Sequence, residues 1–291
     1  MLHKPHQLMR DAREADYAIG AFNTSNMEIA QAIVRAANKK KSPVIMQTSE
    51  GAIEYAGLSM IAAIMQLLAK EAEVPVVIHL DHGKSLDTVK HCIDAGYTSV
   101  MIDQSHLPFE ENIRNTAEAA AYAHGRGVWV EAELGAIVGK EGVKELHGGA
   151  TPDSFFTDPS QAKDFIQRTG IDALAVSVGT IHGAFTGQEY IRFELLAAIE
   201  QAVPDIPLVI HGASGIASEH LQKVCEGHVA KINVDTELRI AFERACGAYF
   251  KQEHDSYDPR SIVGPARDAV QAAVEEKLDL FGSSGTSTIY S

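Results

Sequence analysis

The sequence predicts an α/β protein of the (β/α)8 TIM-barrel class, built as a single domain over residues 1–291. Eight short apolar runs alternate with amphipathic stretches along the chain. Strands that alternate with helices pair in parallel through crossover helices, and eight such units suit a closed barrel. Polar side chains follow nearly every run, and a barrel gathers them on its C-terminal rim. A doubly wound open sheet is the alternative, but it would spread these residues along a much wider edge.

The predicted strands are short, β-rich apolar runs bounded by polar or glycine-containing turns. In chain order they are Ala18–Phe22, Pro43–Thr48, Val74–His79, Ser99–Ile102, Val128–Glu131, Ala173–Val178, Pro207–Ile210 and Ala230–Val234. The polar residues that follow them are Asn23, Ser49, Glu50, Asp81, His82, Asp103, Glu133, His182, His211, Asn233 and Asp235. We expect these side chains to share one rim, which is where barrel enzymes carry their active sites.

Between the strands, apolar residues recur at spacings of three and four, which is the helical period. The predicted helices are Asn26–Lys39, Ser59–Glu71, Leu86–Ala95, Glu110–His124, Pro159–Arg168, Phe193–Gln201, Ser218–Cys225 and Thr236–Phe250. Four of these helices begin at a residue whose side chain can accept from free backbone N–H groups. These predicted N-caps are Asn26, Ser85, Asp158 and Ser218.

Two segments stand outside the repeat. Leu134–Thr157 is long and glycine-rich and carries Glu141. Loops longer than about 12–15 residues without their own structure are usually functional or disordered, so we interpret this one as a mobile lid over the rim. The C-terminal segment Gly282–Ser291 is rich in Ser, Gly and Thr, and we expect it to be loose.

Composition limits the partners and the compartment. The formal net charge of −14 and the pI of about 5.3 argue against nonspecific binding of nucleic acid. No apolar run near the N-terminus resembles a signal peptide, and none elsewhere approaches the roughly 20 residues of a membrane helix. The cysteines Cys92, Cys225 and Cys246 form no CxxC pair and are odd in number. We therefore expect a soluble protein of the reducing cytoplasm, without a membrane partner.

Three histidines follow three different predicted strands, which points to a metal site. His82 follows the third strand, His182 the sixth, and His211 the seventh. Three neutral imidazoles suit Zn²⁺, and a catalytic zinc site keeps a further position open for water or substrate. The convergence of three strand ends on one rim is what separates these residues from ordinary surface histidines.

Two carboxylates and a fourth histidine lie close to this set. Asp103 and Glu133 end the fourth and fifth strands, where they would either hold a second divalent or monovalent cation or orient the ligand histidines. His79 precedes His82 by three residues. On an extended strand we expect His79 inside the barrel or behind the ligands, rather than as a fourth ligand.

The loops after the last two strands are suited to bind phosphate. His211–Ile216 and Asn233–Thr236 each lead into a helix, whose N-terminus offers free N–H groups and the positive end of its dipole. Gly212 and Gly215 let the backbone approach an anion, so an acidic protein can hold an anionic substrate locally. The alternative, Ser214 as a hydrolase nucleophile, lacks the G-x-S-x-G elbow and a following Asp-then-His order.

With these motifs in view, the chain resembles the class II, metal-dependent ketose-bisphosphate aldolases, which include fructose- and tagatose-1,6-bisphosphate aldolases. The resemblance covers essentially the whole chain. The motifs that carry it are Ala21–Asn23, Ser49–Ala52, His79–Gly83, Met101–Asp103, Ser105–His106, Glu131–Gly135, Gly179–Gly183, His211–Gly215, Lys231–Thr236 and Asp258–Arg260. Two segments depart from the family pattern: Val138–Gly142 lacks the second acid after its glutamate, and the tail lacks the closing Asn-Arg.

The resemblance implies a function and a role for each residue. It implies a catalytic zinc on His82, His182 and His211, and a second metal position on Asp103 and Glu133. It implies Asp81 as the acid/base and Glu141, in the lid, as the group that moves a proton on the substrate carbon. The residues implied in binding substrate and its phosphate are Asn23, Ser49, Gly183, Gly212, Ala213, Ser214, Asn233, Val234, Asp235 and Thr236.

The implied reaction is reversible cleavage of a ketose 1,6-bisphosphate to dihydroxyacetone phosphate and glyceraldehyde 3-phosphate. Ser49–Ala52 and Asn233–Thr236 look more like the fructose-bisphosphate members, while tagatose bisphosphate or another ketose phosphate is the alternative. A Schiff base on Lys231 is the rival chemistry, against which we interpret Lys231 as paired with rim carboxylates. A non-catalytic sugar-phosphate sensor is a further alternative, but the sequence retains Asp81 and all three histidines. Members of the family are usually dimers or tetramers, so we expect a homo-oligomer.

Overall fold

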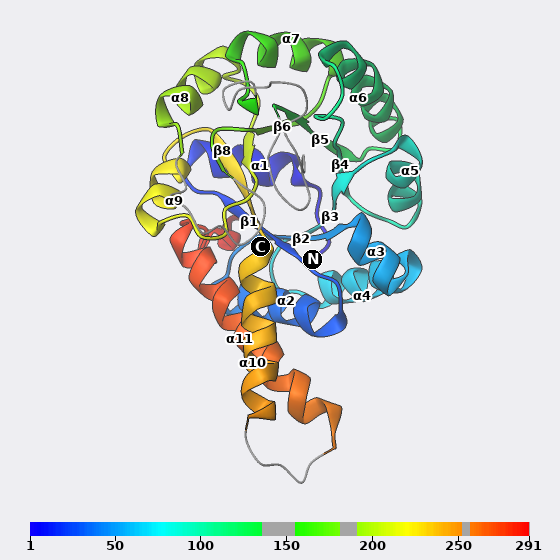
Figure 1. The fold of residues 1–291 in the computed structure, drawn as a ribbon, viewed down its shortest axis with the longest axis vertical. Coiled ribbons are helices and arrows are strands. Elements are labelled where there is room, and N and C mark those ends of the chain that lie inside the picture. The colour runs from blue at the N-terminus through cyan, green and yellow to red at the C-terminus, as the bar shows by residue number, and fades with distance from the viewer. Residues whose placement is uncertain (136–154, 181–190, 252–256, 291) are drawn as a thin grey trace.

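The computed structural model describes residues 1–135, 155–180, 191–251 and 257–290. Its centre is a closed barrel of eight parallel strands in chain order, in which β8 pairs with β1 (Figure 1). The helices lie around this barrel (Figure 1). The predicted barrel is therefore confirmed, and the open sheet is excluded because its two edges would not pair.

All eight predicted strands are present. They are β1 (Ile19–Asn23), β2 (Val44–Ser49), β3 (Val76–Gly83), β4 (Ser99–Ile102), β5 (Trp129–Leu134), β6 (Ala173–Val176), β7 (Leu208–Ile210) and β8 (Val229–Val234). Both β3 and β5 continue beyond their predicted ends. As a result Asp81, His82 and Glu133 belong to strands instead of following them, so the barrel itself fixes their backbones.

The eight predicted helices are also present. They are α2 (Met27–Lys40), α4 (Leu58–Glu71), α5 (Leu86–Asp94), α6 (Phe109–His124), α7 (Pro159–Thr169), α8 (Phe193–Ala202), α9 (Ser218–Cys225) and α10 (Thr236–Phe250). The side chains of Asn26, Ser85 and Asp158 accept from backbone N–H groups of the first turns, as predicted. The predicted cap at Ser218 is wrong: α9 begins at Ser218, and its N-cap is Ala217, which has no side chain able to accept.

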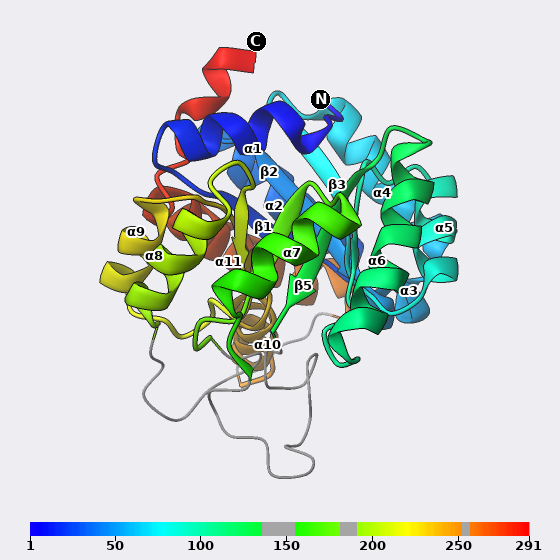
Figure 2. The same ribbon diagram turned by 90° about the horizontal axis from the view of Figure 1, so that it is seen from above.

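Among the described residues, three α-helices and one 3-10 helix were not predicted: α1 (Pro5–Glu14), α3 (Glu50–Ala56), α11 (Pro259–Leu280) and η2 (Thr286–Tyr290). Helix α1 lies across the N-terminal end of the barrel (Figure 2), and its Leu8 and Met9 are buried in the same apolar cluster as interior strand residues. Helix α1 therefore closes the end of the barrel opposite the predicted site.

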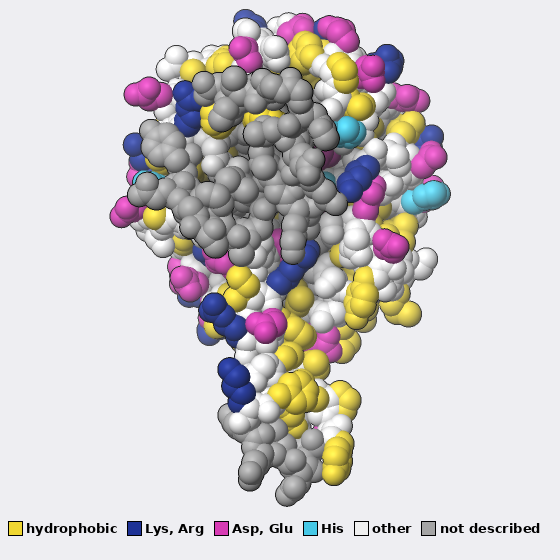
Figure 3. Space-filling view, in the orientation of Figure 1, with side chains coloured by type: hydrophobic (Ala, Val, Ile, Leu, Met, Phe, Trp, Pro, Cys, Tyr) yellow, Lys and Arg dark blue, Asp and Glu magenta, His cyan; other side chains and the backbone are white. Residues whose placement is uncertain are grey.

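Helices α10 and α11 pack against each other and project from the barrel as an arm (Figure 1). Helix α11 also packs along α2, which anchors the arm to the barrel. Yellow hydrophobic side chains are visible on the surface of this arm (Figure 3). Phe250 and Tyr257, near its far end, are 68% and 95% exposed.

The interior of the barrel changes from apolar to polar toward the rim. Successive interior residues on a strand are two apart, because side chains alternate between faces. On β3 the interior sequence is Val77, His79 and Asp81, and on β5 it runs from Trp129 to Glu131 and Glu133; the first member of each series is in the apolar cluster. The apolar end faces α1, so the polar residues lie toward the rim.

The C-terminal segment differs from the loose tail that we expected. Ser283 is fully buried and its hydroxyl meets that of Ser42 at 2.9 Å. The backbone N–H groups of Gly285 and Ser287 donate to carbonyl oxygens at the end of α2. The expectation failed because the tail satisfies carbonyl groups that a helix end leaves free. The predicted lid lies mostly outside the described residues, so it stays a prediction.

Among the described residues, no single helix is long and apolar enough to span a membrane. Helices α3 and α4 meet the criteria of length and composition only as a pair, and they are bent by 99° at their junction.

The packing of α11 gives a stability prediction. Leu278 is fully buried against β1, 3.5 Å from the position that a Cβ on Gly20 would take. Replacing Leu278→Ala should lower the free energy of unfolding by about 2–5 kcal/mol, because it removes buried contacts and leaves a cavity. The matched control Leu67→Ala, at a helical position that is 58% exposed, should change it by less than about 0.5 kcal/mol. Urea unfolding measures both free energies. Equal losses in the Leu278→Ala and Leu67→Ala variants would contradict the described packing of α11.

Candidate active site

The site is built around an unusual backbone conformation at the end of β3. The pairing of β3 with β4 shifts register between Leu80 and Gly83, and His82 has a φ of +49°. A non-glycine residue rarely adopts this left-handed conformation, which is costly and is found mostly at functional sites. A Cβ on the following Gly83 would lie 2.7 Å from the carbonyl oxygen of Met101, so only glycine fits there. The shift brings Asp81 and His82, which are neighbours in sequence, to within 3.8 Å of each other through Asp81 Oδ1 and His82 Nε2.

His82 and His211 face each other at the centre of the site. His82 Nε2 lies 2.9 Å from His211 Nδ1, and both side chains are buried. Each imidazole is held from behind by a carboxylate: His82 Nδ1 lies 2.8 Å from Asp103 Oδ2, and His211 Nε2 lies 2.8 Å from Glu131 Oε1. This carboxylate–histidine arrangement is typical of metal ligands, because it fixes the tautomer and makes the facing nitrogens better donors.

The donor groups fit a divalent cation. His82, His211 and Asp81 form one set whose ligand atoms all lie within 4.8 Å of one another, and His82, Asp103 and Glu133 form a second. Nitrogen and oxygen donors of this kind suit zinc. Burial alone would lower the pKa of His82, but the negative charges of Asp81 and Asp103 outweigh it and raise the pKa to about 10. The same negative charge favours a metal ion between the imidazoles.

Asp81 is held in one orientation by two amide groups. Asn23 Nδ2 donates to Asp81 Oδ2 at 2.8 Å, and Asn233 Nδ2 donates to Asp81 Oδ1 at 3.1 Å. Asn23 is itself oriented by Gln47, whose Nε2 donates to its Oδ1 at 2.7 Å. Burial alone would raise the pKa of Asp81, but positive charge on His82 and the Asn23 hydrogen bond lower it below its ordinary value. Asp81 is therefore an ionised carboxylate with a fixed position, which is the form a base requires.

Asn23 and Asn233, both predicted to contact substrate, thus contact Asp81 in the structure. Ser49 ends β2 directly beside Asp81 in the strand ladder, and its hydroxyl also caps α3 by accepting from Ala52 N. The rim position predicted for these residues is therefore observed. Their contacts in the structure orient the acid/base group and the first turn of α3.

The two predicted phosphate loops lie side by side. Gly212 and Gly215 have φ values of +66° and +96°, so both positions favour glycine. The N–H of Gly215 donates to the carboxylate of Glu237, in the first turn of α10, which joins the loop after β7 to the helix after β8. Ser214 is buried beside them. The structure brings the two loops together, as the sequence predicts.

Other residues predicted to bind phosphate make contacts within the fold. The side chains of Ala213 and Val234 are buried in the apolar core, so a contact with a ligand would have to come from their backbone groups. The carboxylate of Asp235 pairs with Arg239 at 2.6 Å, within the first turns of α10. Thr236 is the first residue of α10. Glu141, His182 and Gly183 lie outside the described residues.

Glu131 is a site residue for which the sequence alone predicts no role. It lies in the middle of β5, fully buried, where it contacts His211 and where Lys231 Nζ approaches its Oε2 to 2.9 Å. His79, predicted to lie inside the barrel, does so: its Nδ1 lies 2.6 Å from Ser99 Oγ and its Nε2 3.6 Å from Glu131 Oε2. A glutamate between apolar neighbours in a predicted strand was the signal available.

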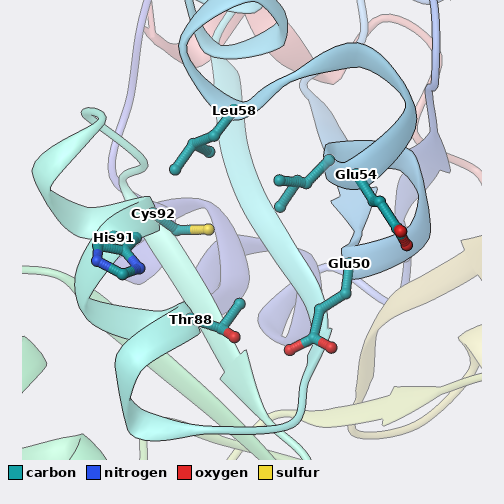
Figure 4. Close-up of a pocket in the computed structure, with 7 residues that line it drawn as sticks. Glu50, Glu54, Leu58, Thr88, His91 and Cys92 are labelled. Atoms are coloured by element: carbon teal, nitrogen blue, oxygen red, sulfur yellow. The ribbon is translucent and has the colours of Figure 1, made fainter.

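Glu50, also expected on the rim, lines a different cavity. This cavity of about 420 Å³ lies between α3 and α5, and Figure 4 shows the Glu50 carboxylate near Thr88 and below His91 and Cys92. Glu50 Oε1 also accepts from the backbone N of Lys84 at 2.9 Å. Glu50 therefore supports the turn that follows β3 and does not belong to the candidate metal-binding set around His82 and His211.

Comparison with known proteins places this geometry in a family. Residues 3–286 match the family model described as fructose-bisphosphate aldolase class-II. The chain is 44% identical over 284 residues to a fructose-bisphosphate aldolase of Geobacillus stearothermophilus, covering 96% of each chain. It is 42% identical over 302 residues to one from Thermus caldophilus, covering 96% of this chain and 97% of that one. The crystal structure of the YdjI aldolase from Escherichia coli K12 matches with a TM-score of 0.87 and 36% identity, over 99% of this chain and 100% of that one.

The carboxylate behind His82 gives a prediction for metal affinity. Replacing Asp103→Asn removes the charge that orients His82 Nδ1, so the affinity for Zn²⁺ should fall by about 10–100-fold. The affinity is measured by competition with a chromophoric chelator. Asp87→Asn, at a side chain that is 83% exposed on α5, is the matched control and should leave the affinity unchanged. If the two variants bind zinc equally well, Asp103 does not act on the metal site.

Proposed function

The chain belongs to the class II fructose-bisphosphate aldolase family, and we propose that fructose 1,6-bisphosphate is the ketose bisphosphate that it cleaves. It is a metal-dependent lyase that reversibly splits a ketose bisphosphate. With fructose 1,6-bisphosphate the products are dihydroxyacetone phosphate and glyceraldehyde 3-phosphate. Tagatose 1,6-bisphosphate differs only in configuration at C4 and is the second candidate. The position of Asp81 beside the facing nitrogens of His82 and His211 supports the cleavage chemistry. The relatives named fructose-bisphosphate aldolase, at 44% and 42% identity, support fructose 1,6-bisphosphate as the substrate.

Asp81 is the proposed acid/base. In the cleavage direction its carboxylate takes the proton of the C4 hydroxyl while the C3–C4 bond breaks. In condensation the carboxyl group returns a proton to the aldehyde oxygen. Its ionised state and the two amides that hold it support this role, since a base must be deprotonated and correctly placed before the substrate binds.

Zinc is the proposed metal, held by His82, His211 and His182, the last of which lies outside the described residues. When bound, the ion supplies Lewis-acid stabilisation of the negative charge that develops on substrate oxygen. We propose Asp103 and Glu133 as a second cation position, supported by the second donor set that they form with His82. The short contact between Asp103 and His82 also supports an orienting role for Asp103 in the single-metal state.

The remaining rim residues bind and orient the substrate in this proposal. The phosphate lies against backbone N–H groups of the two joined loops, because their glycines allow close approach and the start of α10 contributes its dipole. Glu141 moves the proton on the substrate carbon. The proposed substrate-binding residues are Asn23, Ser49, Gly183, Gly212, Ala213, Ser214, Asn233, Val234, Asp235 and Thr236.

We also propose that the enzyme is a cytoplasmic homodimer or homotetramer. The free thiols of Cys92, Cys225 and Cys246 support a reducing compartment. The exposed aromatic side chains of Phe250 and Tyr257 on the arm support association, because exposed apolar surface commonly marks an interface.

Metal removal and a substrate panel test the proposed activity. Incubation with a chelator should abolish release of dihydroxyacetone phosphate, and Zn²⁺ or Co²⁺ should restore it. Fructose 1,6-bisphosphate should have the highest kcat/KM in the panel. Activity that survives the chelator, together with a covalent adduct trapped by borohydride, would establish Schiff-base chemistry instead; the contact of Lys231 with Glu131 argues against it. A higher kcat/KM with tagatose 1,6-bisphosphate would show that this compound, and not fructose 1,6-bisphosphate, is the preferred substrate.

Replacement of Asp81 tests the acid/base assignment. Asp81→Asn keeps the shape of the side chain but cannot accept the hydroxyl proton, so kcat should fall by roughly 10²–10⁴-fold. Zinc content, measured by atomic absorption, should remain at the wild-type value. Asp87→Asn is again the control. A small change in kcat would indicate that another group moves the proton, and it would revive the sugar-phosphate sensor.

A further inference from the structure

Two buried charged residues, Glu131 and Lys231, lie in the barrel interior next to the proposed metal- and substrate-binding residues. Glu131 is two residues before Glu133 on β5, and Lys231 is two residues before Asn233 on β8. Both side chains are completely buried. Barrel interiors are usually filled with branched aliphatic side chains, and a charged pair is expensive to desolvate. A glutamate and a lysine at these positions therefore require an explanation beyond packing.

On one side, Glu131 controls the histidine. Its Oε1 lies 2.8 Å from His211 Nε2. Because a carboxylate only accepts, this nitrogen carries the hydrogen and donates the hydrogen bond to Glu131. The other nitrogen, Nδ1, then presents its lone pair toward His82 Nε2, 2.9 Å away. Without the Glu131 carboxylate, the hydrogen bond that selects this tautomer of His211 is lost.

On the other side, Lys231 controls the amide that holds the acid/base group. Its Nζ lies 2.9 Å from Glu131 Oε2 and donates to Asn233 Oδ1 at 2.7 Å. Because the ammonium group takes the amide oxygen, the amide nitrogen of Asn233 must point the other way. There it donates to Asp81 Oδ1 at 3.1 Å. Without the lysine, a flipped amide would place its oxygen against the carboxylate.

We propose that Glu131 and Lys231 are a positioning pair that fixes the His211 imidazole and the Asp81 carboxylate relative to each other. The contacts run without a break from His211 through Glu131, Lys231 and Asn233 to Asp81. The assignment rests on the proposed function for the roles of His211 and Asp81. Because both side chains are completely buried, Glu131 and Lys231 act through the residues they hold.

This pair differs from a purely structural ion pair in what its loss affects. Loss of a purely structural ion pair would lower the stability of the protein and leave zinc affinity and kcat unchanged. A positioning pair changes two properties of the site separately, because its two members reach different groups. Loss of Glu131 acts on the metal ligand, and loss of Lys231 acts on the orientation of Asp81.

The experiment compares three variants with one control. Glu131→Gln and Lys231→Met each remove one charge and leave the other unpaired. The double variant Glu131→Gln/Lys231→Met leaves no unpaired charge. If a single variant does not fold, the double variant shows whether the pair positions the site residues or only stabilises the fold. Ile45→Ala, in the apolar cluster of the barrel interior, is the control for loss of stability that leaves both charges in place. Each protein is measured for zinc affinity by chelator competition, for kcat and KM at saturating zinc, and for thermal unfolding.

We expect Glu131→Gln to lower zinc affinity by about 10–100-fold. We expect Lys231→Met to lower kcat at saturating zinc by about 10²-fold with little change in KM, since a small displacement of a catalytic group has an effect of this size. The double variant should fold and still show both losses. Ile45→Ala should unfold at a lower temperature with wild-type zinc affinity and kcat.

Wild-type zinc affinity and kcat in the folded double variant would overturn the inference and leave the pair a structural one. The zinc measurement needs no substrate. If the wild-type protein binds zinc but does not cleave any ketose bisphosphate, the proposed function fails, and the zinc affinity of the Glu131→Gln and double variants still decides the role of Glu131.

Discussion

The candidate active site is organised around one contact, the 2.9 Å approach of His82 Nε2 to His211 Nδ1. Two buried imidazole nitrogens that face each other at this distance need a proton or a cation between them. Asp103 and Glu131 hold the remote nitrogens, so each ring is fixed with its other nitrogen directed inward. The left-handed backbone at His82 and the glycine after it are consequences of the same constraint, because they bring His82 beside Asp81.

The barrel separates tasks that would otherwise conflict. The apolar cluster toward α1 supplies stability, and the polar interior residues toward the rim supply chemistry. A net charge of −14 would repel a bisphosphate. The phosphate loops offset this repulsion locally, because their glycines expose backbone N–H groups and the start of α10 carries the positive end of the helix dipole. The same negative charge, concentrated near His82 by Asp81, Asp103 and Glu133, favours a cation at the site.

The sequence predicted the barrel and most of its rim because periodicity and strand ends are local signals. It missed α11, which contains Gly264 and Pro265 and so looks interrupted, and α3, which follows β2 without a loop. It missed the packed tail because the partners of Gly285 and Ser287 are carbonyl groups far away in the chain. Glu131 had no predicted role for a similar reason: its role comes from contacts with His211, directly after β7, and with Lys231 on β8, which no sequence spacing encodes.

Diffraction from crystals of the zinc-loaded protein, collected at the zinc absorption edge, would show directly whether the two facing histidines hold the metal. We expect an anomalous peak about 2.0–2.1 Å from both His82 Nε2 and His211 Nδ1, with Asp103 and Glu131 still in contact with the remote nitrogens. A principal peak on His82 Nδ1, Asp103 and Glu133, with none between the two histidines, would contradict it.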